Sequence, residues 1–357
     1  MTLRKYYYNI VYLGLLVFLV LNFLYFNWNV HAESFDSGIN IDNKYNTLSS
    51  KDNCSKSFGI LRYDYENFRN SDYSKYTPLD VNVGDYIQSI SAAQYITSKY
   101  QSRILINRDS LKYYNGSPVD MIMNGWYFIH EKNEVFSNKI NPIFVAFHIN
   151  NINEVNNKTI EYLKKSEPIG CRDHYTERFL ISKGVKAYFS GCLTTTLDLK
   201  YKVDDRMRNN DIIFCDYKFG YNGEIDKRLR DVLSSYNLDN ITHITHSMSK
   251  DTSHFQRFKA ADDILKKYAK AKLVVTTRIH CALPCLALGT PVILVNSYYD
   301  FRRYDGLYEL LNTIGPDNSG NWSNKINFDS DHKIVNSNLY LEYANKLKSY
   351  LFSRLSN

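Results

Sequence analysis

The chain has 357 residues, of which 44% are hydrophobic, so it is long enough and apolar enough for two ordinary domains with a sizeable core. Its formal net charge of +7 is diffuse, and no arginine-rich run accompanies it, which argues against a nucleic-acid-binding protein. The six cysteines form no CxxC pair and show no Cys/His spacing typical of zinc, so the sequence predicts no metal site.

The N-terminal segment has the features of a membrane anchor. Arg4 and Lys5 precede the apolar run Ile10–Phe26, whose length is at the short end of a membrane-spanning helix. We expect residues 1–28 to form a cytosolic tail and a signal-anchor helix. This predicts a single-pass type II membrane protein whose body lies in the lumen of an ER- or Golgi-like secretory compartment. The alternative is a secreted protein, cleaved from a signal peptide near Ala32.

Five N-x-S/T sequons are compatible with a glycoprotein in that compartment, although an asparagine-rich chain also yields such triplets by chance. They begin at Asn53, Asn115, Asn157, Asn240 and Asn321.

The next segments predict a stem and a first folded domain. Residues 29–56 are polar and lack hydrophobic periodicity, which is typical of a flexible stem. Residues 57–198 alternate short apolar runs with helical patterns, which predicts an N-terminal Rossmann-like domain with a parallel sheet. The expected strands are Phe58–Arg62, Arg103–Asn107, Asp120–Met123, Ile143–His148, Pro168–Cys171 and Ala187–Ser190. The expected helices are Asp85–Ser98, Ile152–Lys165 and Asp173–Lys183.

A second alternating block follows a charged segment at residues 199–210, which we expect to be a linker. Residues 211–357 then predict a C-terminal Rossmann-like domain with a closing helix. Its expected elements are strands Asp211–Cys215 and Ile241–Thr245, helices Glu224–Ser235 and Ser253–Ala269, the strand-helix-strand segment Val274–Val295, a loop Gly315–Lys325 and the closing helix Ser337–Leu355. The expected fold is therefore α/β, with two Rossmann-like domains facing each other across a cleft.

Polar residues interrupt the apolar segment Val274–Val295 where its first strand meets its helix. Thr277, Arg278 and His280 lie at this junction. Ligands of parallel α/β sheets bind beyond the carboxyl ends of strands, and helix N-termini attract anions. The junction therefore predicts anion binding and proton transfer. The alternative is structural: a salt-bridged arginine and a hydrogen-bonded histidine.

Two further junctions have the same character. Asn82, Gly84 and Asp85 lie where a loop enters the first helix, so Asp85 is a candidate base in the cleft or merely a helix cap. Arg172 ends a strand and Asp173 begins a helix. Arg172 is a candidate ligand for a carboxylate or phosphate, or half of an Arg–Asp ion pair.

Weaker candidates are Trp126, whose ring could hold a sugar, and His148, which ends a predicted strand. Tryptophan is more often partly buried core, and a lone histidine is usually satisfied by hydrogen bonds. The chain has no GxxxxGK[ST] loop, no GxGxxG after a strand and no GxSxG elbow. These absences argue against the usual nucleotide hydrolases, dinucleotide oxidoreductases and serine hydrolases.

Taken together, these pieces resemble the polysaccharide pyruvyl transferase family. The resemblance rests on Asn82–Asp85, on Arg172 with Asp173, and on Thr277–His280 with Ala287–Ile293 behind it. It covers most of residues 58–312.

The chain also departs from the family pattern at three places. Ile279 stands where the family usually has leucine between the arginine and the histidine. Asn124–Trp126 stands where many members have a run of glycines, a difference that concerns the acceptor pocket. The turn at Ser190–Thr194 replaces the Asp-Pro turn of bacterial members.

The resemblance implies a fold similar to glycosyltransferase-B and a ketal-forming transferase. The implied reaction transfers a pyruvyl group from phosphoenolpyruvate to two hydroxyls of one sugar in a glycan and releases phosphate. Terminal galactose and mannose-type sugars are the acceptors it suggests, and no cofactor is required beyond the donor substrate. The implied residues are His280 and Asp85 for catalysis; Arg172, Arg278, Gly84 and Thr277 for the donor; and Asn82, Trp126 and His148 for the acceptor.

The expected partners are thus phosphoenolpyruvate, a glycan or polysaccharide and, through the anchor, a membrane, with no nucleic acid. Two alternatives stay open at this point. One is a nucleotide-sugar-dependent glycosyltransferase of the same fold, and the other is a catalytically inactive, membrane-tethered glycan-binding protein.

Overall fold

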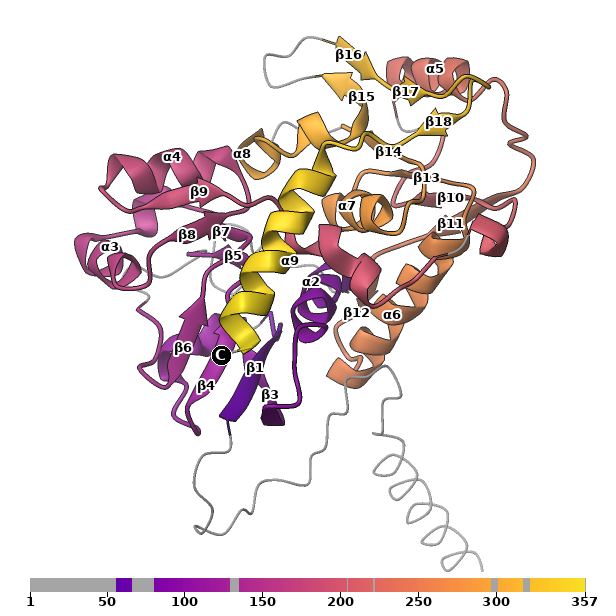
Figure 1. Ribbon diagram of the computed structural model, residues 1–357. Coiled ribbons are helices and arrows are strands. Elements are labelled where there is room, and N and C mark those ends of the chain that lie inside the picture. The colour runs from indigo at the N-terminus through magenta and orange to yellow at the C-terminus, as the bar shows by residue number, and fades with distance from the viewer. Residues whose placement is uncertain are drawn as a thin grey trace, which may run out of the picture. The chain divides into compact units, whose positions relative to one another are not determined.

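A computed structural model describes residues 56–65, 80–128, 135–203, 205–220, 222–296, 301–316 and 322–356, all within one compact unit, Cys54–Asn357 (Figure 1). Helices and predominantly parallel strands confirm the expected α/β class. Among these residues, no helix is both long and apolar enough to cross a membrane. The expected anchor, and the expected stem up to residue 55, lie outside the described residues.

The first half of the unit contains two four-stranded sheets, and every strand pair in them is parallel. One has the order β3-β1-β4-β6, formed by Tyr100–Asn107, Lys56–Arg62, Val119–Ile122 and Ile140–Ile143. The other has the order β5-β7-β8-β9, formed by Gly125–Tyr127, Phe147–Ile149, Ile169–Cys171 and Ala187–Phe189.

Backbone hydrogen bonds continue from one of these sheets to the other. Met123 N donates to Ile143 O (2.9 Å) and Gly125 N donates to Ala146 O (3.2 Å). The prediction of one unbroken strand at Ile143–His148 was therefore wrong, because Ala146 adopts a left-handed conformation with φ 52°. Its neighbours are apolar throughout, so the sequence carries no sign of this break.

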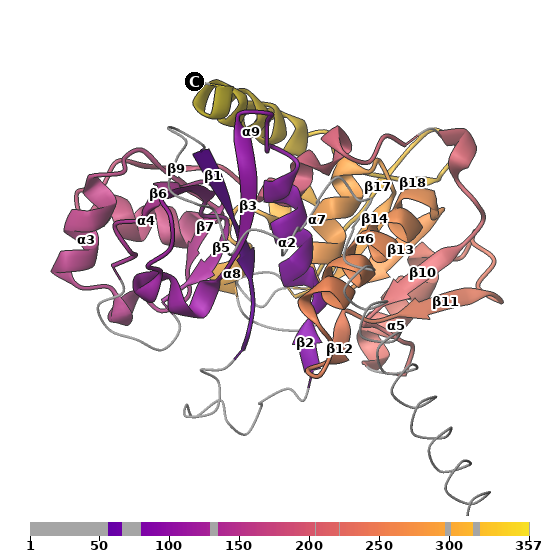
Figure 2. The same cartoon turned by 90° about the horizontal axis from the view of Figure 1, so that it is seen from below.

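The helices of the first half are α2 (Val83–Ala93), α3 (Asn157–Lys164) and α4 (His174–Ser182), with 3₁₀ turns η4 (Arg108–Tyr113), η5 (Ile152–Glu154) and η6 (Leu193–Leu199). Helix α2 begins two residues earlier than expected because Asn82, not Asp85, caps it: Asn82 Oδ1 accepts from Gly84 N (3.0 Å). Every residue of α2 is buried, since it lies against β1, η6 and the helices α6 and α7 of the second half (Figure 2).

The second half is built on one six-stranded sheet of order β11-β10-β13-β14-β15-β16. Its strands are Ile241–Ile244, Ile212–Cys215, Leu273–Thr276, Val292–Val295, Asn312–Pro316 and Trp322–Lys325. Only the pair β15–β16 is antiparallel among the described pairs of this sheet. The expected loop Gly315–Lys325 was wrong at its ends, because Trp322–Lys325 pairs with β15 although its composition is polar.

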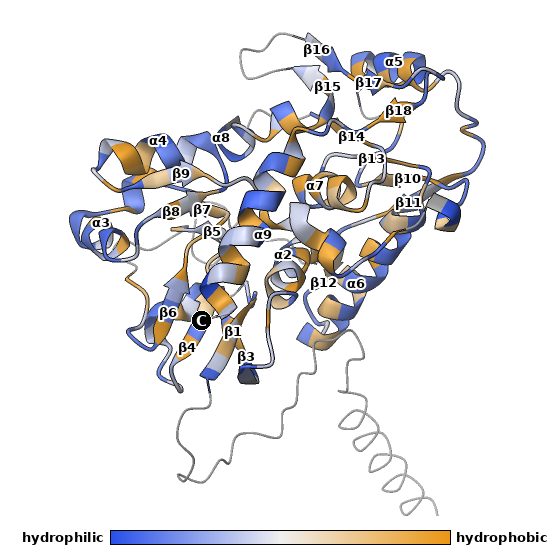
Figure 3. Cartoon of the chain, viewed as in Figure 1, coloured by the Kyte–Doolittle hydropathy of each residue, from blue (hydrophilic) through white to orange (hydrophobic). Residues whose placement is uncertain are grey.

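The helices of the second half are α5 (Gly223–Val232), α6 (His254–Lys270), α7 (Ile279–Ala287), α8 (Phe301–Tyr304) and α9 (Tyr340–Ser356), with 3₁₀ turns η7 (Asp205–Met207) and η8 (Tyr308–Leu310). Figure 3 shows hydrophilic and hydrophobic residues together on α5 and α6, whereas α7 is mostly hydrophobic. All nine residues of α7 are buried. A mostly apolar helix belongs inside a protein, so the first turn of α7, including His280, lies in the interior.

Two short antiparallel ladders complete the fold: β2 (Asp80–Asn82) with β12 (Ser247–Ser249), and β17 (Asn327–Phe328) with β18 (Ile334–Val335). The first ladder joins the two halves beside the start of α2. Arg257 of α6 also connects the second half to the first, since its buried guanidinium donates hydrogen bonds to Tyr63 O and Tyr86 Oη (both 3.0 Å).

The expected closing helix, α9, packs on residues of the first half. The ring of Tyr343 meets Phe189 edge-on at 5.0 Å, and Phe352 lies 5.4 Å from Tyr95. Lys348 also pairs with Asp198 at the end of η6 (2.6 Å). The last helix therefore returns from the second half and fastens onto the first.

Candidate functional site

The three sequence junctions meet where the N-termini of α2 and α7 approach each other. Gly84, in the first turn of α2, lies so close to α7 that a Cβ atom added to it would be 3.1 Å from His280 Cβ. The same atom would be 3.2 Å from His246 Nδ1. Because Gly84 has no Cβ atom, the two helix N-termini and their positive dipole ends can approach this closely.

His280 is a buried imidazole at this meeting point. It is 3% exposed, and its Nε2 atom has no hydrogen-bond partner among the described residues. Burial, followed by the charges of Arg172 and Arg303, lowers the pKa of His280 well below its ordinary value. The imidazole is therefore neutral at neutral pH, and its free nitrogen can accept or relay a proton.

Arg172 supplies a buried positive charge beside His280. Its side chain is 1% exposed, and within the described part of the chain none of its three guanidinium nitrogens has a hydrogen-bond partner. The adjacent Asp173 carboxylate is 3.7 Å from Arg172 Nε, an ion-pair distance without a hydrogen bond. A buried guanidinium with five unused donors is costly, and a bound anion would supply the missing acceptors.

Arg303, in α8, adds to this positive potential. Its Nε atom is buried without a hydrogen-bond partner in the described ranges. Its charge lowers the pKa of His280 and, after stronger contributions from burial, the pKa of His148 and Arg172 as well. The charges of Arg303 in α8 and of Arg172 at the end of β8 therefore both affect His280. Together they give this site a positive potential that attracts a multiply charged anion.

His148 and Asp173 form a buried dyad next to Arg172. His148 Nδ1 donates to Asp173 Oδ2 (2.6 Å), while Asp173 Oδ1 caps α4 by accepting from Thr176 N (2.9 Å). Burial lowers the pKa of His148 to about 4, although Asp173 opposes that shift. The dyad is thus a neutral histidine held by an ionised carboxylate. It leaves His148 Nε2 without a partner among the residues that the structure describes.

Asp85 is a buried carboxyl in α2. Tyr65 Oη donates to its Oδ2 (2.6 Å) and Gln88 Nε2 to its Oδ1 (3.2 Å). Burial raises the pKa of Asp85, while the charge of Arg108 and the hydrogen bond from Tyr65 oppose the rise. A carboxyl in this state holds its proton to higher pH than usual, which suits a proton donor.

Arg278 and Thr277 face a different partner. Arg278 Nε donates to Asp216 Oδ2 (2.9 Å), Thr277 Oγ1 donates to Asp216 O (3.1 Å), and the Arg278 side chain is 44% exposed. Asp216 is itself fixed by His246 N, which donates to its Oδ2 (3.0 Å). The structure therefore holds Arg278 at the edge of the site, whereas Arg172 lies buried beside His280.

Trp126 lies between two arginines. The guanidinium carbon of Arg108 is 4.7 Å from the centroid of the Trp126 ring, and that of Arg303 is 5.8 Å away. Arg108 and Arg303 were not predicted, although both follow the carboxyl ends of strands, Arg108 directly after β3 and Arg303 after β14. Their position in the chain was the available signal.

Comparison with known proteins places the chain in a family. The polysaccharide pyruvyl transferase model matches residues 82–298, which include the junctions at Gly84, Arg172 and His280. No curated protein matches. One similar solved structure is a functionally uncharacterised protein from Klebsiella pneumoniae, at 16% identity and a TM-score of 0.39, covering 72% of this chain and 90% of that one. Since the family match spans more than half of the sequence, the chain belongs to the polysaccharide pyruvyl transferase family.

Proposed function

We propose that this protein transfers a pyruvyl group from phosphoenolpyruvate to two hydroxyls of one sugar in a glycan, forming a cyclic ketal and releasing phosphate. The observation that carries the proposal is the buried Arg172 guanidinium, without hydrogen-bond partners in the described chain, beside the neutral His280. Phosphoenolpyruvate carries a phosphate and a carboxylate, so it offers the acceptors that this positive site needs.

The donor is expected to lie against the arginines. Arg172 and Arg303 act on the same place, and the N-termini of α2 and α7 add their dipoles there. We expect Arg278, which Asp216 holds at the edge of the site, to bind the second anionic group of the donor.

The reaction needs one proton added to carbon and two protons removed from hydroxyls. Asp85 is our candidate for the acid that protonates the methylene carbon, because burial raises its pKa. Protonation leaves an electron-poor carbon, which the first sugar hydroxyl attacks. Loss of phosphate regenerates such a carbon for the second hydroxyl. One hydroxyl proton is thus balanced by the new methyl hydrogen, and the other leaves with phosphate.

The base that accepts a hydroxyl proton is expected among the unpartnered ring nitrogens. His280 Nε2 is our first candidate, since it lies at the junction of α2 and α7 beside the donor arginines. His148, oriented by Asp173, faces the same positive charges and is expected to contact the acceptor, as is Trp126. Asn82 acts on this site indirectly, by capping α2.

The test is phosphate release from phosphoenolpyruvate by the full chain, with a panel of galactosides and mannosides. We expect release that requires a sugar and is lost in Arg172→Gln and His280→Asn. Arg228→Gln is the matched control, because Arg228 pairs with Glu224 on the surface of α5 and should keep full activity. Folded protein that turns over a nucleotide sugar instead, or binds glycans without releasing phosphate, would refute the proposal.

A further inference from the structure

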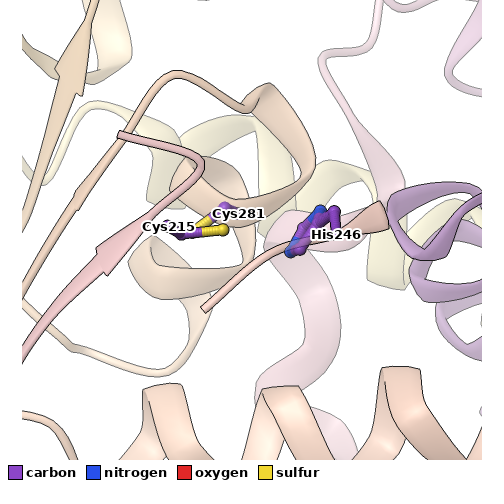
Figure 4. Close-up of side chains that lie close together, drawn as sticks. All are labelled: Cys215, His246 and Cys281. Carbon is purple, nitrogen blue, oxygen red and sulfur yellow. The ribbon is translucent and has the colours of Figure 1, made fainter. Parts of the chain in front are cut away.

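A cluster of soft metal ligands lies behind the donor site. Cys215, His246 and Cys281 each offer one ligand atom, and these atoms all lie within 4.8 Å of one another (Figure 4). They come from three separate segments: the end of β10, the stretch between β11 and β12, and the first turn of α7. Because the three residues lie far apart in the sequence, a search for characteristic Cys/His spacings does not find the cluster.

All three side chains are buried. Cys215 and Cys281 are 0% exposed and His246 is 1% exposed. In Figure 4 the two sulfur atoms lie beside each other, with the His246 ring facing them. A divalent cation with two thiolates and a neutral imidazole has no net charge. Such a set can therefore be buried without the cost of an isolated ion.

The Tyr268 hydroxyl contacts two members of the cluster. Tyr268 Oη donates to Cys215 Sγ (3.2 Å) and lies 2.9 Å from His246 Nε2. The tyrosine hydroxyl therefore links two members of the cluster and fixes the orientation of the His246 ring.

We propose that Cys215, His246 and Cys281 bind one zinc ion, which fastens the start of α7 to the end of β10. Sulfur and nitrogen ligands in a buried site suit Zn²⁺, and a water molecule or the neighbouring Tyr268 hydroxyl would complete the four-coordinate set. The ion would lie close to His280 but would not take part in the reaction, because Cys281 directly follows His280 and His246 Nδ1 lies next to Gly84. Its role is to hold the first turn of α7, and with it His280, in place.

The direct test is the metal content of the purified full chain, measured by mass spectrometry of the elements. We expect about one zinc per chain, as for a structural site. In Cys215→Ser and Cys281→Ser the content should fall to less than about a tenth of that value. The control is Cys192→Ser, because Cys192 is equally buried but hydrogen-bonds Thr194 Oγ1 (3.2 Å) away from the cluster.

A second measurement covers variants that fail to fold. Replacing the metal of the unmodified chain with Co²⁺ should give thiolate-to-cobalt absorption of the strength expected for two thiolates. Zinc-free folded protein, a disulfide between Cys215 and Cys281 in its intact mass, or cobalt binding without that absorption would overturn the proposal. None of these readouts depends on pyruvyl transfer.

Discussion

Gly84 and His280 lie so close together that a methyl group at position 84 would require the neighbouring atoms to move by a few tenths of an ångström. A Cβ atom at position 84 would be 3.1 Å from His280 Cβ and 3.0 Å from Asn82 Oδ1. This contact joins the first turn of α2 to the first turn of α7. It therefore links Asp85 on one helix to the imidazole on the other.

Gly84→Ala should disturb the site more than the fold. The new methyl group must push α2 away from α7, so we expect activity to fall at least about tenfold, as small displacements of catalytic groups do. The free energy of unfolding should fall by roughly 1–2 kcal/mol. Gly223→Ala is the control, since Gly223 also opens a helix but, among the residues that the structure describes, no atom lies within 4 Å of its added Cβ. Equal activity in both variants would show that the contact is unimportant.

Arg172→Gln should abolish donor binding without destabilising the protein. The Arg172 guanidinium makes no hydrogen bond to the described residues, and without it Asp173 keeps its hydrogen bonds from His148 and Thr176 N, so the substitution should cost little stability. Thermal unfolding without ligand should begin no lower than in the parent chain. The increase in stability on adding phosphoenolpyruvate, about 2.7 kcal/mol at a hundredfold excess over Kd, should disappear. A retained shift would place the donor elsewhere.

Tyr65→Phe should shift the alkaline limb of the pH–turnover profile to higher pH. Tyr65 donates a hydrogen bond to Asp85 and so favours the ionised carboxylate. Without that bond the pKa of Asp85 rises. If Asp85 is the acid, the rate falls only above this pKa, so the alkaline limb should shift to higher pH. Asp85→Asn should lose turnover altogether. An unmoved alkaline limb in Tyr65→Phe would exclude Asp85 as the acid.

His148 should make the protein less stable in acid. Its folded pKa, about 4, lies below that of an unfolded histidine, so the unfolded state binds more protons between these values. The stabilisation is complete above the unfolded pKa and is lost as the pH falls toward 4. The parent chain should lose roughly 2 kcal/mol from this group between pH 7 and 4.5. His148→Gln should show a shallower pH slope in urea unfolding. Identical slopes would contradict the assignment.

The sequence predicts the architecture wherever burial leaves a clear pattern. Strands such as Leu273–Thr276 and the wholly buried α7 have long apolar runs, and their expected positions are confirmed. The break at Ala146 and the strand Trp322–Lys325 were missed, because tertiary hydrogen bonding decides them.

The candidate site was predictable to the extent that strand ends reveal it. Arg172, His280 and Asp85 follow this rule, and the structure buries all three. Arg108 and Arg303 obey the same rule but lie outside the strongest motifs. The cluster of Cys215, His246 and Cys281 arises only when three distant segments fold together, so no spacing along the chain could show it.

Pyruvyl transfer is tested most directly by looking in one product for both the ketal and the hydrogen that the methylene carbon takes up from solvent. The full chain is incubated in D₂O with phosphoenolpyruvate and the galactoside or mannoside that supports phosphate release. The product is examined by mass spectrometry and proton NMR. Pyruvyl transfer should give a cyclic pyruvate ketal on two hydroxyls of one sugar, whose methyl group carries one deuterium from solvent. An unmodified sugar, or phosphate released without any ketal, would contradict it.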